Sequence, residues 1–256
     1  MKNTITIIIL HILLCCTCQA QEKVVENRPY TDLRKFHFGI LVGTHMQDIE
    51  FNNVGLHTYT DENGNKQEAL ITCDQNQWEP GFNIGVLGEI RLHTHFQLRI
   101  APTLYFGTRH YNFRNLTADQ NNKELSTKQQ DMKTAYISTA IELIAAAPRF
   151  NNHRPYLMFG INPMINLSGN DDDILKLKSS DVFIEAGLGC DFYLPYFKLR
   201  PELKFMFGLT NCLDKNHANK VKDGALLPYT TSVDQAKSKI IALTFYFELN
   251  KKCTLI

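Results

Sequence analysis

Residues Phe197–Phe205, with the sequence FKLRPELKF, alternate between two kinds of side chain. The odd-numbered positions carry Phe, Leu, Pro, Leu and Phe, whereas the even-numbered positions carry Lys, Arg, Glu and Lys. Successive side chains of a β-strand point to opposite faces of the sheet. The sequence therefore predicts a strand with one apolar face and one strongly ionic face.

The same period-two pattern recurs along the chain of 256 residues, and we count eight such segments. Each is rich in Val, Ile, Leu and Phe on one parity and in charged, polar or small residues on the other, as expected of strands. The eight segments are residues 36–49, 81–92, 96–113, 135–146, 154–167, 181–193, 197–211 and 239–249.

The connections between these segments alternate in length. Residues 93–95, 148–153 and 194–196 are short links, whereas residues 52–80, 114–134, 168–180 and 212–238 are long and polar. An even number of strands with short turns at one end and long loops at the other is typical of a bacterial outer-membrane barrel. The alternation alone fits a soluble barrel too, since it does not say which face is inside. The connections favour an all-β fold, namely an eight-stranded antiparallel transmembrane β-barrel with a filled polar lumen.

In that fold the apolar face contacts lipid and the ionic face points into the lumen. The lumen of an eight-stranded barrel is just wide enough to be filled by side chains, and buried charges are costly unless they are paired. We therefore expect a structural ion-pair core rather than a catalytic site. Its expected members are Glu89, Arg91, Arg99, Arg109, Glu142, Glu185, Asp191, Arg200, Glu202, Lys204 and Glu248.

The N-terminus has the features of a cleaved secretory signal. Lys2 precedes an apolar run of residues 5–14, and Cys18-Gln19-Ala20 supplies small residues before the expected cleavage site. That run is too short for a membrane-spanning helix, which needs about 20 residues. We predict a signal peptide over residues 1–20, an N-terminal leader over 21–35, the barrel over 36–249 and a C-terminal tail over 250–256. Lipidation of a cysteine in residues 15–18 is the alternative.

Composition excludes some functions. The chain has 27 basic and 26 acidic residues, and this balance argues against nucleic-acid binding, which needs a basic surface. The four cysteines of the mature chain match no zinc-site spacing. Whether Cys73 and Cys212 form a disulfide is left open. Both lie in long loops that barrel closure brings near each other.

Other candidate sites have simpler structural explanations. His93 and His95 supply two metal ligands at a turn, too few for a zinc or copper site. The acidic run 171–173 lacks the further ligands of a calcium loop, and Asn63-Gly64 predicts a β-hairpin turn within the first long loop. We expect no catalytic, cofactor-binding or metal site.

Aromatic residues flank the short link 194–196. An outer-membrane barrel carries such residues where the membrane meets water, although one of them, Tyr193, has lumen parity. The expected interface aromatics are Phe192, Tyr193, Tyr196 and Phe197.

The segment Cys190–Leu209, CDFYLPYFKLRPELKFMFGL, resembles the PorT family of outer-membrane β-barrel proteins. Residues 36–48 (FHFGILVGTHMQD), 130–137 (QDMKTAYI) and 154–160 (RPYLMFG) show the same resemblance, which extends over roughly residues 35–249. The long loops match this family only loosely.

The resemblance implies a location in the bacterial outer membrane with both termini in the periplasm. It also implies a non-enzymatic role in assembling or operating the type IX protein secretion and gliding-motility machinery. The expected partners are outer-membrane lipid and other secretion proteins, with no nucleic acid and no small-molecule substrate. A structural or adhesive barrel that acts through its surface loops is the alternative, and a lipid-modifying barrel enzyme is a third class.

Overall fold

The computed structural model describes residues 25–60, 64, 66–118, 126–169, 173–219, 221 and 224–249. The expected signal peptide, the first residues of the leader and the C-terminal tail lie outside the described residues.

Eight long antiparallel strands form a closed ring. The order around it is β5-β4-β1-β10-β9-β8-β7-β6, and pairing of β6 with β5 closes the barrel. Closure gives each ring strand a hydrogen-bonded neighbour on both sides, as a bilayer requires. The strands are β1 (Phe36–Asn53), β4 (Pro80–Arg91), β5 (Phe96–Asn115), β6 (Thr127–Ala146), β7 (His153–Asn166), β8 (Ser180–Tyr193), β9 (Phe197–Gly208) and β10 (Val233–Leu249). The prediction of an eight-stranded antiparallel barrel is confirmed.

The two faces of the strands are sorted as a membrane barrel requires. Phe38 is 65% exposed and Phe159 is 60% exposed on the outer wall, whereas Arg200 and Glu142, which point inward, are 0% exposed. A soluble barrel would bury the apolar row and expose the charges. The apolar face of Phe197–Phe205 therefore looks outward, and its ionic face fills the lumen.

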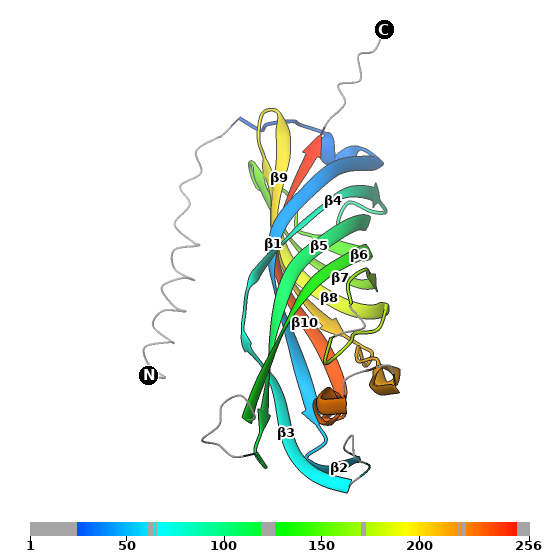
Figure 1. Ribbon diagram of the computed structural model, residues 1–256. Helices are drawn as coiled ribbons and strands as arrows, with labels where there is room; N and C mark the ends of the chain where they lie inside the picture. The colour runs from blue at the N-terminus through cyan, green and yellow to red at the C-terminus, as the bar shows by residue number, and fades with distance from the viewer. Residues whose placement is uncertain are drawn as a thin grey trace, which may run out of the picture.

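The apolar band has a clear end on β5 and β6. On β5 the outward positions are apolar up to Phe106 and polar from Thr108 onward; on β6 they change between Lys133 and Ala135. The strands continue beyond this band toward the end that carries the long loops (Figure 1).

Strands β5, β7 and β9 each carry a proline away from their ends, on the outward parity: Pro102, Pro163 and Pro201. Pairing of β4 with β5 skips the position opposite Pro102, while the pairing of Pro102 with Thr139 of β6 is intact. Pro163 and Pro201 likewise interrupt the ladder on one side, toward β6 and β8, and keep the other. Because proline removes one N–H donor, each disturbs one neighbour only, and the register does not shift there.

A ribbon extends the sheet beyond the ring. The short strand β2 (Leu56–Thr60) pairs with β3 (Lys66–Gln77), and β3 continues along the outer part of β5. The predicted hairpin is thus present, although residues 61–63 and 65 of its turn lie outside the described residues.

Short helices accompany the loops. They are η1 (Thr31–Leu33) before β1, and η2 (Lys215–Asn219), η3 (Gly224–Leu226) and α3 (Leu227–Thr230) between β9 and β10. In the part of the chain that the structure describes, no helix has the length and apolar character needed to cross a bilayer. Residues 25–35 and the end of β10 lie at the end of the barrel opposite to the ribbon (Figure 1).

Candidate functional site: a buried ionic network with a cap at each end

Arg99 of β5 is the centre of the lumen. Its Nη1 donates hydrogen bonds to Glu142 Oε2 at 2.9 Å and Glu202 Oε2 at 2.8 Å, and its Nε faces Glu89 Oε2 at 3.4 Å. These carboxylates come from β6, β9 and β4, and all four side chains are 0% exposed. One guanidinium thus joins strands from opposite sides of the barrel.

The network continues along β9. Arg200 donates from Nη1 to Glu89 at 2.5 Å and lies with Nε 2.6 Å from Asp191, and Lys204 contacts both Glu142 and Glu202. Lys198 Nζ lies 2.5 Å from Glu248 and 3.6 Å from Asp191. The alternating charges of the Phe197–Phe205 segment therefore supply three of the lumen cations.

Tyrosine hydroxyls complete the coordination of the carboxylates. Tyr156 donates to Glu202 Oε2 at 2.7 Å and Tyr246 donates to Glu202 Oε1 at 3.1 Å. The Arg99 guanidinium lies 4.3 Å from the ring centroid of Tyr246, in cation–π geometry. Apolar ring faces and ion pairs together fill the bore.

His37 extends the network at the end of the barrel that carries the leader. Its Nδ1 lies 2.5 Å from Glu248 Oε1 and its Nε2 lies 3.2 Å from the carbonyl oxygen of Arg34. Both partners are acceptors, so the ring contacts an acceptor through each nitrogen. Acidic and basic side chains are thus closely matched in the bore. The basic members are His37, Arg99, Lys198, Arg200 and Lys204, and the acidic members are Glu89, Glu142, Asp191, Glu202 and Glu248.

Three residues expected in this core make no ion pair with it. Arg91 is half-exposed at the end of β4, where the strand leaves the lumen, and makes no ion pair among the described residues. Glu185 makes no ion pair there either, but it borders the network: it accepts a hydrogen bond from Asn162 at 3.2 Å and interacts with Lys204 and Glu142.

Arg109 lies beyond the network, toward the long loops. Its Nε donates to Gln47 Oε1 at 2.8 Å and its Nη2 to Ser238 Oγ at 2.8 Å, and its guanidinium has no carboxylate within ion-pair distance in the described part of the chain. Parity gives the correct face for these three residues, but not their depth.

Two members of the network are absent from the sequence-based set. Lys198 and His37 have lumen parity but lie near the ends of their strands, and only the positions of Glu248 and Arg34 show that the network reaches them. The signal that could have found Lys198 is its place in the same alternating row as Arg200 and Lys204.

A cap formed by the leader closes the short-turn end. Asp32 of η1 accepts hydrogen bonds from the hydroxyl of Tyr193 at 2.7 and 2.8 Å and lies 3.7 Å from Arg154 and 4.0 Å from Lys198. Thr31 beside it is buried. The ionic network therefore ends on the leader.

A second set of contacts fixes the preceding residues. Arg149 Nη2 donates to the carbonyl oxygen of Asn27 at 2.5 Å, and the backbone N–H of Asn27 donates to Asn152 Oδ1 at 2.8 Å. The Arg149 guanidinium lies 3.7 Å from the ring centroid of Tyr193. Residues 25–35 are thus part of the folded barrel.

The expected interface aromatics divide into two groups. Tyr196 is 89% exposed and Phe192 is 41% exposed beside the short turn, and Phe197 packs on Phe247 with 5.8 Å between ring centroids. Tyr193 is 1% exposed, because its lumen parity places it under the leader. Assigning Tyr193 to the membrane interface was wrong.

An apolar cap closes the long-loop end. It combines the outer parts of β1, β3, β5, β6 and β10 with the loops before β8 and β10. Its buried members include Ile71, Phe113, Leu175, Leu213 and Tyr229. Both mouths of the barrel are therefore covered by packed protein.

Cys73 and Cys212 belong to this outer cap and are free thiols. Burial raises the pKa of the Cys212 thiol to about 11, and the thiol donates to the carbonyl oxygen of Ala236 at 3.2 Å. The disulfide left open by the sequence is absent from the structure.

The remaining candidates form no metal site among the described residues. The rings of His93 and His95 lie 6.1 Å apart, and His95 faces the carbonyl oxygen of Ala146. Asp171 and Asp172 lie outside the described residues, and the carbonyl oxygen of Asp173 faces His217 Nε2 at 2.6 Å.

The fold and the filled lumen define the class of protein as a small integral outer-membrane barrel. The family model for the outer membrane protein beta-barrel domain matches residues 19–214, and the chain belongs to this family. No curated protein matches the sequence.

Several solved structures are similar in fold. Neisserial surface protein A shares 10% identity and a TM-score of 0.41, with 84% of this chain and 97% of that chain covered. OprG from Pseudomonas aeruginosa is 12% identical with a TM-score of 0.45, and the match covers 85% of this chain and 98% of OprG. Ail of Yersinia pestis, solved in complex with the heparin analogue sucrose octasulfate, is 12% identical with a TM-score of 0.35. The match covers 84% of this chain and 100% of Ail.

Proposed function

We propose that this outer-membrane barrel is a non-enzymatic component of the type IX protein secretion machinery, of the PorT kind, needed for its assembly or operation. The resemblance of residues 190–209 and three further segments to that family motivates the proposal. The single structural observation that supports it is the filled lumen, whose ion-paired side chains are at most 3% exposed.

A filled lumen limits what the protein does. A folded cargo protein cannot pass through a bore occupied by side chains, and the caps cover both ends. The chain therefore acts through its surfaces, which are the membrane wall, the short turns and the structures beyond the apolar band. Its partners are other proteins of the secretion machinery.

The proposed orientation places the short turns and both termini in the periplasm and the ribbon at the cell surface. Long extracellular loops and short periplasmic turns are the rule for bacterial barrels. Single cysteines introduced at Asn216, in η2, and at Asn151, in a short turn, test this on intact cells. An impermeant maleimide should label Asn216→Cys only, and labelling of Asn151→Cys alone would reverse the orientation.

Gene deletion followed by fractionation tests the function. We expect proteins exported by the type IX route to accumulate in the periplasm and to return to the medium when the wild-type gene is restored. Normal export from the deletion strain would overturn the proposal.

An adhesive barrel is the second candidate, and the β2–β3 ribbon is the observation that favours it. The ribbon projects past the apolar band, and the hydroxyl of Tyr59 donates to Gln67 Oε1 at 3.1 Å across the hairpin. Deletion of residues 56–70 separates the two functions. Loss of surface attachment with normal export would support adhesion.

A further inference from the structure

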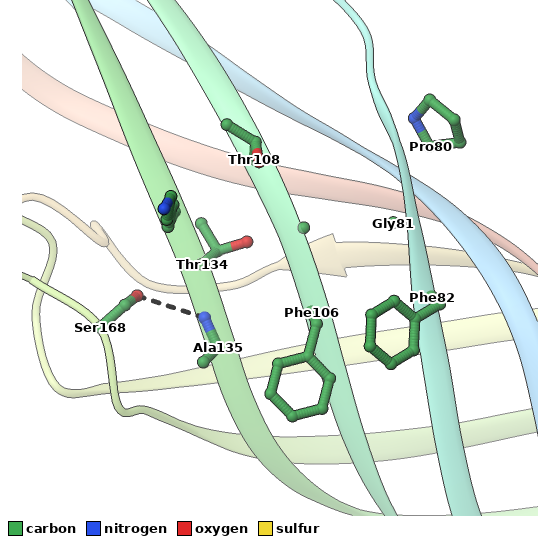
Figure 2. Close-up of a pocket in the computed structure, with 10 residues that line it drawn as sticks. Pro80, Gly81, Phe82, Phe106, Thr108, Thr134, Ala135 and Ser168 are labelled. Atoms are coloured by element: carbon green, nitrogen blue, oxygen red, sulfur yellow. Dashed lines mark hydrogen bonds between the residues drawn. The ribbon is translucent and has the colours of Figure 1, made fainter.

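The outer wall of the barrel is hollowed where the apolar band ends. The hollow lies across β4, β5 and β6 and has a volume of about 410 Å³. Phe82 and Phe106 lie side by side at its lower edge, with stacked rings whose centroids are 5.0 Å apart (Figure 2). Ser168 borders it on the far side, where its Oγ accepts a hydrogen bond from the backbone N–H of Ala135 at 3.3 Å.

A second hollow of about 460 Å³ continues the first into the apolar band. Its walls are the next outward residues on the same strands, Ile84 and Val86 of β4, Leu104 of β5 and Ile137 of β6, together with Val42 of β1. From Phe82 to Val86 the strand advances roughly 13 Å. The two hollows lie in succession along β4, β5 and β6, and we refer to them together as the groove; their combined length matches much of an acyl chain.

The polar end of the groove carries one cation. Lys133 is exposed beside Thr108, and it makes no ion pair within the described part of the chain. Two acidic side chains at this end of the strands, Glu79 and Asp131, hold His110 between them at 3.0 and 2.6 Å. Their charge is thus directed to the imidazole, and Lys133 is left to face the membrane surface.

We propose that this wall binds a phosphorylated glycolipid of the outer leaflet, with its phosphate on Lys133 and one acyl chain along the two hollows. The assignment of leaflet rests on the orientation proposed above. Basic groups at the membrane surface recognise anionic lipid head groups, and the apolar groove beneath Lys133 is where an attached chain must lie. A neutral lipid would leave the cation without a partner, so the phosphate determines the preference.

Native mass spectrometry of the purified barrel in neutral detergent tests this. The probes are a hexa-acylated, bis-phosphorylated glucosamine disaccharide lipid, the same lipid without phosphates, and phosphatidylglycerol. We expect one phosphorylated glycolipid to bind, with an affinity at least about tenfold above that for each of the other two lipids. The variants Lys133→Glu and Ala135→Trp should each lower this affinity about tenfold, the first by reversing the charge and the second by filling the groove.

Matched controls lie on the opposite wall. Lys237→Glu reverses an exposed charge on β10, and Ala186→Trp enlarges an outward residue of β8; both should bind as the wild type does. Heat-modifiable migration on a gel shows that each variant is folded. Equal binding by wild type, Lys133→Glu and Ala135→Trp would overturn the site, and equal binding of phosphatidylglycerol would overturn the choice of lipid. Neither result depends on the secretion assay.

Discussion

Arg99 contacts carboxylates from three strands, and its removal should be among the most damaging single changes in the barrel. In Arg99→Met, Glu89 keeps Arg200 and Glu142 keeps Lys204, but the network loses one of its positive charges. Removing one partner of a buried ion pair costs about 3–5 kcal/mol. We expect a loss of that size in the free energy of unfolding, measured by urea titration in detergent.

Arg91→Met is the matched control for this change. Arg91 has the same charge and lumen parity but is half-exposed at the strand end, so its replacement should alter the free energy of unfolding by less than about 0.5 kcal/mol. Equal losses in the two variants would show that the network does not hold the barrel together.

The reactivity of the Cys212 thiol tests whether the apolar cap at the long-loop end is closed. In a variant that keeps only this cysteine, burial should make alkylation slow, because the raised pKa leaves little thiolate near pH 8. The unfolded chain, with an ordinary thiol pKa, should react about a hundredfold faster. The folded rate should keep rising with pH up to about 11, the pKa of the buried thiol.

The comparison for Cys212 is a cysteine placed at exposed Asn216, with Cys212 replaced by Ser. That thiol should react equally fast in the folded and unfolded chain, as measured by mass spectrometry after timed quenching. A folded-state rate for Cys212 close to that of Asn216→Cys would mean that the cap is open in solution.

Single residues also show what the sequence could and could not reveal. Strand alternation assigns Arg109, Glu185 and Arg91 to the lumen side correctly. It carries no information on which residues meet across the bore, since Arg99 and Glu202 lie 103 positions apart. The depth of each residue depends on barrel shear and strand tilt, which a single chain does not encode locally.

At the scale of elements, the strands were predictable and the leader was not. The alternation predicts all eight ring strands and Asn63-Gly64 predicts the β2–β3 hairpin, because period-two hydrophobicity and turn residues are both local signals. Residues 25–35 have no such period, and their place is set by Asn152, Tyr193 and Arg149, more than 100 residues away. Docking of the leader depends on tertiary contacts, so no pattern in the leader's own sequence predicts it.

The leader cap makes a prediction about proteolysis. Asp32→Asn removes the charge that meets Tyr193, Arg154 and Lys198, and each charge-assisted hydrogen bond contributes roughly 1.5–3 kcal/mol. Trypsin cleavage after Arg28 or Arg34 should become at least about tenfold faster, since about 1.4 kcal/mol corresponds to tenfold. Glu26→Gln changes an exposed acid in the same segment and should leave the rate unchanged. Unaltered cleavage of Asp32→Asn would mean that Asp32 does not hold the leader in place.

At the scale of the whole molecule, the apolar outer face and the pairing of charges in the bore depend on each other. An apolar wall allows the barrel to enter the membrane, and closure of β5 on β6 satisfies the backbone within it. The ionic rows must then meet in the bore, where basic side chains face carboxylates from other strands. The net charge of the chain is only +1, so net charge does not reveal this strong separation of apolar and ionic groups.

The filled bore predicts that the purified barrel does not conduct ions. In a planar bilayer at 1 M potassium chloride, we expect no steady channel of the size that a porin gives, because the lumen of an eight-stranded barrel holds side chains rather than water. A 16-stranded porin inserted by the same procedure is the positive control. Deletion of residues 25–35 separates the roles of the leader and the network: if Arg99 and its partners occlude the bore, the shortened barrel stays closed as well. Stable porin-level conductance from the full chain would contradict the plug and, with it, the inference that this protein acts through its surfaces.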